Sequence, residues 1–264
     1  MEASNFKNMN FLTTGNQSGL GRYVHETLGG MGLARNTPKS EHEAIKKNSF
    51  DAIIHCAVNS TKTFDPSSMY SYFQDNIFLT DELTSLKCKK FIYLSSVDVY
   101  CKDSELVSEN KTFNSDNLIS IYAATKLASE STIQRRCKNH LILRSVSPLG
   151  KYSRKNTLIK MIEDDPCTVG LSASSVYNII IYSDILNFIK HAIDKDLQGV
   201  FNLASSGNII LGEIAGILKK NIHFGKHHYN VGSIDNNKIA SHFPVFRNNS
   251  KDNLIKYLSE HNNV

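Results

Sequence analysis

The sequence of 264 residues lacks several features that mark particular classes of protein. It contains no run of about 18 apolar residues, and its polar start, MEASNFKNMN, has no apolar segment of the kind found in signal peptides. The five cysteines are odd in number, lie far apart and form no C-x-x-C pair, which argues against a disulfide framework and a zinc site. These absences favour a cytoplasmic protein with no membrane span and no bound metal.

An excess of charge of one sign is also missing. The 30 basic residues outnumber the 25 acidic residues by only five, and no five like charges stand together. Composition therefore gives no indication of nucleic-acid binding, although a mildly basic surface would attract a phosphorylated small molecule. Tandem repeats, low-complexity tracts and proline-rich linkers are absent as well, so we expect one globular unit or a large domain carrying a small one.

The sequence does contain short apolar runs that alternate with longer segments of helical periodicity, which predicts a parallel sheet covered by helices on both faces. Strands are expected at 9–13, 52–56, 90–94, 140–144 and 199–203, and helices at 69–86, 121–136 and 211–218. The predicted fold class is α/β, a Rossmann-like doubly wound parallel sheet with a small C-terminal substrate-binding part. Only 14 residues separate Arg35 from Phe50, so one strand of the usual pattern is expected to be short or missing there.

This pattern also suggests a division of the chain. Residues 1–147 are expected to form the dinucleotide-binding Rossmann domain. Residues 148–264 are expected to form mainly the substrate-binding part, with 179–204 returning to the Rossmann sheet.

A glycine-rich loop follows the first predicted strand and leads into a helical segment. Its glycines are Gly15, Gly19 and Gly21, within the run TGNQSGLG. Glycine lets the backbone turn tightly and approach a pyrophosphate, and the start of the helix offers free N–H groups and a positive dipole end to that anion. The loop is therefore a candidate phosphate-binding site.

Arg35 stands at the end of the second predicted strand, read as 32–35. An acidic residue at this position would hold the ribose hydroxyls of NAD, whereas an arginine accepts the additional 2′-phosphate of NADP. Arg35 therefore favours NADP, with NAD as the alternative cofactor. An ordinary exposed arginine after a strand is the competing interpretation.

A serine, a tyrosine and a lysine form the candidate catalytic set. Ser96 ends the third long strand, and Tyr122 and Lys126 follow on a predicted helix. Positions i and i+4 share a helix face, so these two side chains project together, and an ammonium near a phenol would lower the pKa of that phenol. Ser96 could hydrogen-bond the same substrate oxygen with which Tyr122 exchanges a proton.

These segments resemble a known family. The combination of TGNQSGLG, IIHCAV, YLSSVDVY, YAATK and LRSVSPLG is similar to the extended branch of the short-chain dehydrogenase/reductase superfamily, the nucleotide-sugar epimerases, dehydratases and reductases. The resemblance covers nearly the whole chain and implies that Ser96, Tyr122 and Lys126 are catalytic. The cofactor-binding residues that it implies are Gly15, Gln17, Ser18, Gly19, Leu20, Arg35, Ala57, Tyr122, Lys126 and Pro148.

The chain departs from the family pattern at four positions. Ser18 stands where the loop usually has a glycine, and Val97 replaces the first residue of the Asp-Glu pair that dehydratases carry. Dehydration is therefore not expected. Tyr177 takes the place of an arginine that binds the substrate diphosphate in many members of the family, and Ser147 takes the place of an asparagine before Pro148. The substrate is therefore expected to be bound differently.

The basic residues that follow Gly150 could bind the substrate diphosphate in place of the missing arginine. Lys151, Arg154 and Lys155 could pair with a diphosphate, although a solvated basic loop is the plain alternative. The residues expected to contact substrate are Ser96, Asp98, Ser147, Lys151, Arg154, Lys155 and Tyr177.

The resemblance and the residues together predict an enzyme. The favoured activity is NADP-dependent reduction of a keto group, most simply at C4, on a nucleoside-diphosphate-linked sugar, with the proton supplied by Tyr122. The first alternative is an NAD-dependent nucleotide-sugar epimerase that uses the same site. The second is a protein that keeps the dinucleotide fold but performs no chemistry. By analogy with the family, a homodimer is expected.

Overall fold

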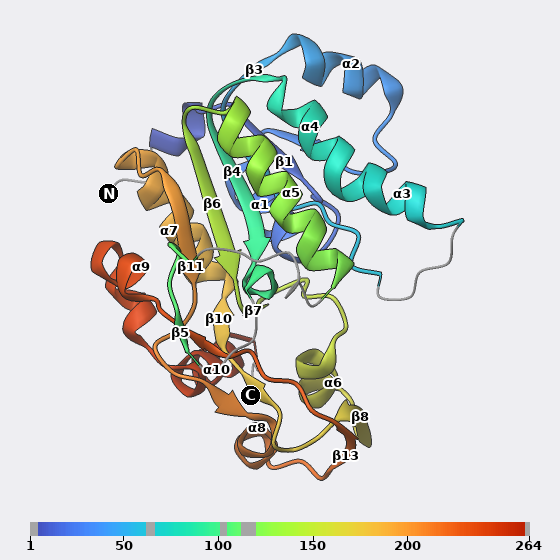
Figure 1. Ribbon diagram of the computed structural model, residues 1–264, viewed down its shortest axis with the longest axis vertical. Coiled ribbons are helices and arrows are strands. Elements are labelled where there is room, and N and C mark those ends of the chain that lie inside the picture. The colour runs from blue at the N-terminus through green and yellow to red at the C-terminus, as the bar shows by residue number, and fades with distance from the viewer. Residues whose placement is uncertain (1–4, 62–66, 101–104, 112–119, 262–264) are drawn as a thin grey trace.

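The computed structural model describes residues 5–61, 67–100, 105–111 and 120–261 (Figure 1). Its centre is a parallel sheet of six strands in the order β11-β6-β4-β3-β1-β2. The strands of this sheet are β1 (Phe11–Thr14), β2 (Met31–Leu33), β3 (Ser49–His55), β4 (Lys87–Ser96), β6 (His140–Ser145) and β11 (Gly199–Leu203). The predicted Rossmann-like parallel sheet is therefore confirmed.

The short stretch between Arg35 and Phe50 holds one helix, α2 (Lys39–Lys47), between β2 and β3. Residues 34–48 are all described and contain no strand. As a result, β2 is an edge strand of the sheet. This agrees with the short or missing strand that the spacing predicted.

Both faces of the sheet are buried because successive side chains of a strand point to opposite faces. Phe11 and Ile92 join one apolar cluster with residues of α1 (Gly19–Leu28) and α7 (Tyr182–Asp194). Leu12 and Phe91, their immediate neighbours, join a second cluster with residues of α2, α4 (Leu79–Thr84) and α5 (Ile121–Arg136). Figure 1 shows α5 and α4 in front of the sheet and α1 and α7 behind it.

The helix expected at 69–86 is divided into three pieces. A π-helical turn, η2 (Gln74–Phe78), separates α3 (Met69–Phe73) from α4. Inside that turn Asn76 is buried and exchanges hydrogen bonds with the backbone of Asn59, through Asn59 N to Oδ1 (2.8 Å) and Nδ2 to Asn59 O (2.9 Å). This exchange ties the helix to the chain that leaves β3.

The second part of the molecule lies beyond the carboxyl ends of the main strands (Figure 1). It has its own apolar cluster, which includes Leu149, Ile159, Ile181 and Leu254. Outside the main sheet, the described strands form four pairs: β7 (Ser147–Leu149) with β10 (Ile179–Ile181), β8 (Cys167–Leu171) with β13 (Ile222–His227), β9 (Val176–Tyr177) with β12 (Ile209–Ile210), and β5 (Leu106–Val107) with β14 (Ser233–Ile234).

Four further helices and three short 3₁₀ turns complete the part of the chain that the structure describes. The helices are α6 (Thr157–Glu163), α8 (Leu211–Leu218), α9 (Asn237–His242) and α10 (Ser250–His261), and the turns are η1 (Asn5–Asn8), η3 (Val97–Val99) and η5 (Pro244–Arg247). Within the 179–204 segment, β10 pairs with β7 outside the main sheet, whereas β11 joins the main sheet. The division of the chain at residue 147 remains a prediction.

None of the described helices is both long enough and apolar enough to span a lipid bilayer.

Candidate active site

The phosphate loop begins where β1 ends, at the carboxyl edge of the sheet. Gly15 has a φ of +68°, and a Cβ there would lie 3.0 Å from the backbone of Ala57, so a side chain is excluded. A Cβ on Gly21 would overlap the Gly15 carbonyl oxygen. The loop therefore depends on glycine at both positions to pack α1 closely against β1 and β3.

Ser18 does not disturb this loop, although it stands where the family usually has a glycine. Its backbone is extended, with φ −155° and ψ 163°, a conformation that any residue adopts. It precedes α1 as the N-cap residue. The departure at Ser18 is therefore compatible with an anion-binding helix start.

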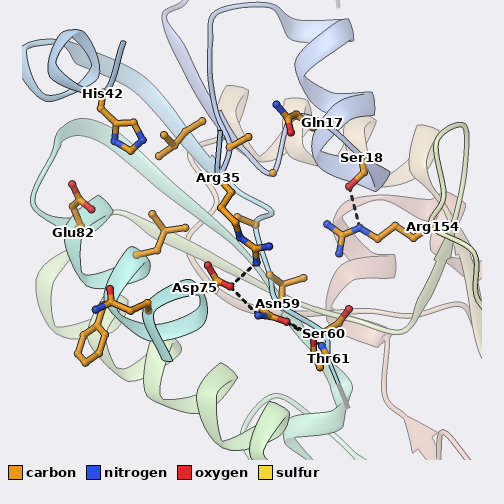
Figure 2. Close-up of a pocket in the computed structure, with 18 residues that line it drawn as sticks. Gln17, Ser18, Arg35, His42, Asn59, Ser60, Thr61, Asp75, Glu82 and Arg154 are labelled. Carbon is orange, nitrogen blue, oxygen red and sulfur yellow. Dashed lines mark hydrogen bonds and ion pairs between the residues drawn. The ribbon is translucent and has the colours of Figure 1, made fainter. Parts of the chain in front are cut away.

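A cleft of about 610 Å³ opens beside the loop. Gly15, Gln17, Ser18, Arg35 and Ala57 line it, and Figure 2 shows the labelled ones around its rim. The other five expected cofactor residues do not line it: Gly19, Leu20, Tyr122, Lys126 and Pro148. Leu20, in α1, is buried in the apolar core, and Pro148 lies in β7 opposite Ile180. The glycine-lined loop and the two arginines that line the cleft, Arg35 and Arg154, fit a dinucleotide with its anionic diphosphate.

Arg35 does not stand free at the end of β2. Its Nη2 lies 2.6 Å from Oδ2 of Asp75, and Asn59 Nδ2 donates to the same oxygen at 2.8 Å. All three residues line the cleft, and dashed lines join them in Figure 2. Asp75 and Asn59 were not identified from the sequence. Asn59 follows the predicted strand 52–56, which is the one signal that could have found it.

The three basic residues after Gly150 have different surroundings. Arg154 Nε donates to Ser18 Oγ at 3.0 Å, and Arg154 lines the cleft (Figure 2). Lys151 lies over the ring of Tyr152, and Lys155 pairs with Asp164 at 2.7 Å. Only Arg154 is therefore brought to the cleft, and it lies at the phosphate loop.

Tyr152, which the sequence did not single out, connects this segment to the loop. Its carbonyl oxygen accepts a hydrogen bond from Gly19 N at 2.8 Å, and its ring stacks under Arg22 of α1. The segment after β7 thus lies directly against the start of α1.

The candidate catalytic residues meet at the end of β4. Ser96 is the last residue of that strand, and its Oγ accepts a hydrogen bond from Asp98 N at 3.1 Å. Tyr122 and Lys126 are one turn apart in α5, whose start is capped by Ser120 through Ala123 N at 3.1 Å. Lys126 Nζ donates to the carbonyl of Leu94 at 2.7 Å and lies 5.8 Å from the centre of the Tyr122 ring.

The expectation that Lys126 lowers the pKa of Tyr122 is not supported by the surroundings of the phenol. Burial raises the pKa of Tyr122 well above its usual range, and the charge of Asp98 adds to this effect. A hydrogen bond with Ser96 opposes it. Burial also lowers the pKa of Lys126 to about 8, because the ammonium is held away from water.

A buried histidine links β1, β3 and α4. His55 Nδ1 lies 2.7 Å from Thr14 Oγ1, and Nε2 lies 3.0 Å from Thr80 Oγ1. Thr14 Oγ1 accepts from Ala57 N, so its own hydrogen is available to Nδ1. Burial lowers the pKa of His55 to about 3, and the side chain is a neutral structural link.

The remaining expected substrate residues come from three different elements. Asp98 is half-buried in η3, Ser147 donates its N–H to Asn178 O at 3.1 Å, and Tyr177 lies in β9. The ring of Tyr177 contacts that of Tyr229, with centroids 5.0 Å apart. Burial raises the pKa of Tyr229, and Asp98, Tyr177 and Tyr122 act on it electrostatically, so these groups share one region.

Tyr229 is a further residue that sequence reasoning missed. It comes from the 205–246 segment, more than a hundred residues after Tyr122, and no motif marks it. The hydrogen bonds from Val176 N to Tyr229 O, at 2.7 Å, and from Tyr229 N to Ser175 Oγ, at 3.1 Å, bring it beside β9.

Comparisons with known proteins agree with this geometry. A family model described as the NAD dependent epimerase/dehydratase family matches residues 15–204. No curated protein matches the chain by sequence. Among the described residues, no three His, Cys, Asp or Glu side chains are grouped so as to hold a metal ion.

Many solved structures share the fold. A dTDP-4-dehydrorhamnose reductase from Bacillus anthracis, in complex with NADP, has a TM-score of 0.79 at 16% identity and covers 96% of this chain and 99% of its own. The reductase of the same name from Yersinia enterocolitica has a TM-score of 0.73 at 23% identity, with the same coverage. A UDP-glucuronic acid 4-epimerase from Bacillus cereus, in complex with UDP-glucuronic acid and NAD, has a TM-score of 0.74 at 18% identity, again over 96% and 99%.

The family model spans well over half of the sequence, and its match begins at the phosphate loop and ends just after β11. The chain therefore belongs to the NAD-dependent epimerase/dehydratase family of extended short-chain dehydrogenases/reductases, and it is an enzyme that uses NAD or NADP.

Proposed function

We propose that this enzyme reduces a keto group, at C4, of a nucleoside-diphosphate-linked sugar with NADPH. The observation that carries the proposal is the meeting of Ser96, Tyr122 and Lys126 at the carboxyl end of β4. The cleft that Arg35 lines opens at the same edge of the sheet, where Gly15 follows β1 and Ala57 follows β3, although Ser96, Tyr122 and Lys126 do not line it. In open parallel sheets, ligands bind at this edge. The dTDP-4-dehydrorhamnose reductases with the same fold act on a substrate of this class, which supports the choice.

The chemistry assigns a distinct part to each residue. NADPH, when bound, supplies the hydride that the substrate carbon receives. Ser96 orients the carbonyl oxygen, and Tyr122 donates its phenolic proton to that oxygen. Burial raises the pKa of Tyr122, which keeps the phenol protonated at neutral pH, the state that a proton donor requires. Lys126 would hold the nicotinamide ribose.

The substrate grip differs from the family pattern. Arg154 is the basic residue of its segment that lines the cleft, and its Nε donates to Ser18 of the phosphate loop, so it is our candidate for contact with the diphosphates of both the cofactor and the substrate. The rings of Tyr177 and Tyr229 form an apolar wall near Asp98, suited to a sugar or a base. Lys151 and Lys155 remain weaker candidates because each already contacts a neighbouring side chain.

The proposal is tested by Tyr122→Phe. We expect turnover of keto-sugar nucleotides to fall by about 10²–10⁴-fold, the range seen when a general acid is removed, while the affinity for NADPH stays nearly unchanged. NADPH oxidation at 340 nm and fluorescence titration measure the two quantities. Tyr70→Phe, at an exposed position of α3, is the control. Turnover of the Tyr122 variant at the wild-type rate would refute the role of this residue.

An epimerase that uses the same site is the second candidate. It is favoured by the UDP-glucuronic acid 4-epimerase fold match and by the partial neutralisation of Arg35 by Asp75. Denaturing freshly purified protein and analysing the released nucleotide separates the two activities. Stoichiometric NAD supports epimerisation, whereas an empty protein that binds and oxidises NADPH supports reduction.

A further inference from the structure

Arg35, on which the expectation of NADP depends, is half of an ion pair inside the cleft. Its guanidinium is 2.6 Å from the Asp75 carboxylate. The Arg35 side chain is 76% exposed and that of Asp75 is 27% exposed, so both face the space of the cleft. Figure 2 shows Arg35, Asp75 and Asn59 in a row along one wall.

The Asp75 carboxylate is held firmly in place. Asn59 Nδ2 donates to it at 2.8 Å, and the backbone of Asn59 is fixed by two hydrogen bonds with Asn76, the residue next to Asp75. These contacts connect the end of β3 to the π-helical turn η2. Asp75 therefore carries a positioned negative charge, which would stay in the cleft when Arg35 moves.

The two charges act in opposite directions on a dinucleotide. A guanidinium attracts the 2′-phosphate that distinguishes NADP from NAD, whereas a carboxylate repels that phosphate and accepts hydrogen bonds from unphosphorylated ribose hydroxyls. A carboxylate 2.6 Å from the guanidinium offsets much of the attraction that Arg35 alone would provide.

We propose that Asp75 sets the cofactor preference of this enzyme by opposing Arg35, so that the cleft discriminates only weakly between NADPH and NADH. The inference rests on the proposed function, because it requires a nicotinamide dinucleotide whose adenosine ribose lies at Arg35. It adds Asp75 as the residue that determines cofactor specificity.

The test compares the dissociation constants of NADPH and NADH for the full chain and two variants, by fluorescence titration at fixed ionic strength. Asp75→Asn keeps the size of the side chain and an oxygen for Asn59, but removes the charge. We expect this variant to bind NADPH about tenfold more tightly and NADH no more tightly, which raises the preference for NADPH about tenfold. Arg35→Gln is expected to lower that preference by a similar factor.

Asp81→Asn is the matched control, because Asp81 lies in the adjacent α4 and pairs with Arg136 at 2.9 Å, and it does not line the cleft. It should leave both dissociation constants unchanged. An unaltered preference in Asp75→Asn, with both dinucleotides still bound, would overturn the role of Asp75. A loss of NADPH affinity in Asp75→Asn as large as the loss in Arg35→Gln would also overturn this role, because the Asp75 carboxylate would then act only by positioning Arg35. If the folded wild-type protein binds neither dinucleotide, the proposed function fails together with this inference.

Discussion

At the scale of single residues, burial has more influence than neighbouring charge on the protonation states around the site. Burial lowers the pKa of His55 to about 3 and that of Lys126 to about 8, and it raises the pKa of Tyr122. Sequence spacing predicted that the Lys126 charge would dominate at Tyr122. The predicted and the observed pKa shifts differ because the spacing of residues along a helix shows which side chains are neighbours, but not whether water reaches them.

The buried ammonium of Lys126 leads to a pH-dependent stability. Its pKa in the folded protein, about 8, lies below the ordinary value of 10.5, so the unfolded chain binds more protons between these two values. The free energy of unfolding of the wild type, relative to Lys126→Met, is therefore expected to rise as the pH rises through 8, by up to about 3 kcal/mol. Urea unfolding at pH 7 to 10 measures it.

The control for this measurement is Lys89→Met, which removes an exposed lysine from β4. Both variants lose one ammonium, but only that of Lys126 is buried. If the two differences from wild type changed with pH in the same way, burial of Lys126 could not be the cause.

At the scale of elements, α5 is fixed to the sheet by a buried ion pair directly after the proposed catalytic motif. Glu130 lies one turn beyond Lys126, and Arg144 Nη2 of β6 reaches its Oε2 at 2.7 Å. Ser95, next to Ser96, donates to Oε1 of the same carboxylate. Arg144 also donates to the hydroxyl of Tyr100, which donates to Asn202 of β11 at 2.7 Å. One carboxylate therefore sets the position of α5 relative to β4 and β6.

Glu130→Gln is expected to lower the free energy of unfolding by about 3–5 kcal/mol, because it leaves the Arg144 charge buried without its partner. Denaturant unfolding measures the change. The comparison is Asp81→Asn, which breaks the exposed pair with Arg136 and should cost no more than about 1 kcal/mol. Similar losses in the two variants would show that the buried pair does not hold α5.

At the scale of the whole molecule, the main sheet with its helices and the second part of the molecule are joined along the carboxyl edge of the sheet. One connection is the pair of Lys256 in α10 with Asp184 in α7, at 2.9 Å. Another is the segment after β7, where Tyr152 O accepts from Gly19 N and Arg154 contacts Ser18. The cleft is therefore lined by residues of both parts, and a ligand there would contact both. The expected homodimer and cytoplasmic location remain predictions.

This arrangement predicts that Arg154 couples cofactor binding to the stability of the whole molecule. NADPH at about 100 times its dissociation constant is expected to stabilise the wild type by about 2.7 kcal/mol, seen as a rise in Tm. Arg154→Met should reduce that rise, because a cation beside the diphosphate is lost. Lys155→Met should leave the rise in Tm unchanged, because Lys155 pairs with Asp164 and does not line the cleft. An undiminished rise in Arg154→Met would assign Arg154 to the substrate alone.

Local patterns were sufficient for much of the fold and part of the site. The apolar runs predicted the strands of the main sheet, and the helix expected at 121–136 has those bounds in the structure. The loop glycines and the Ser96, Tyr122 and Lys126 set were also read from short segments. Other features depend on distant contacts. Asp75 faces Arg35 from 40 residues away, and Tyr229 meets Tyr177 only through the pairing of two late segments.

The sequence by itself therefore determined the class of protein, the layered sheet and the residues able to transfer a proton, because periodicity and motif spacing are local properties of the chain. Only the tertiary structure decided which charges oppose one another in the cleft, which lysines are turned away from it, and how burial shifts the pKa of Tyr122 and Lys126. Those outcomes depend on distances between side chains and on exclusion of water, and both are set when remote segments pack together.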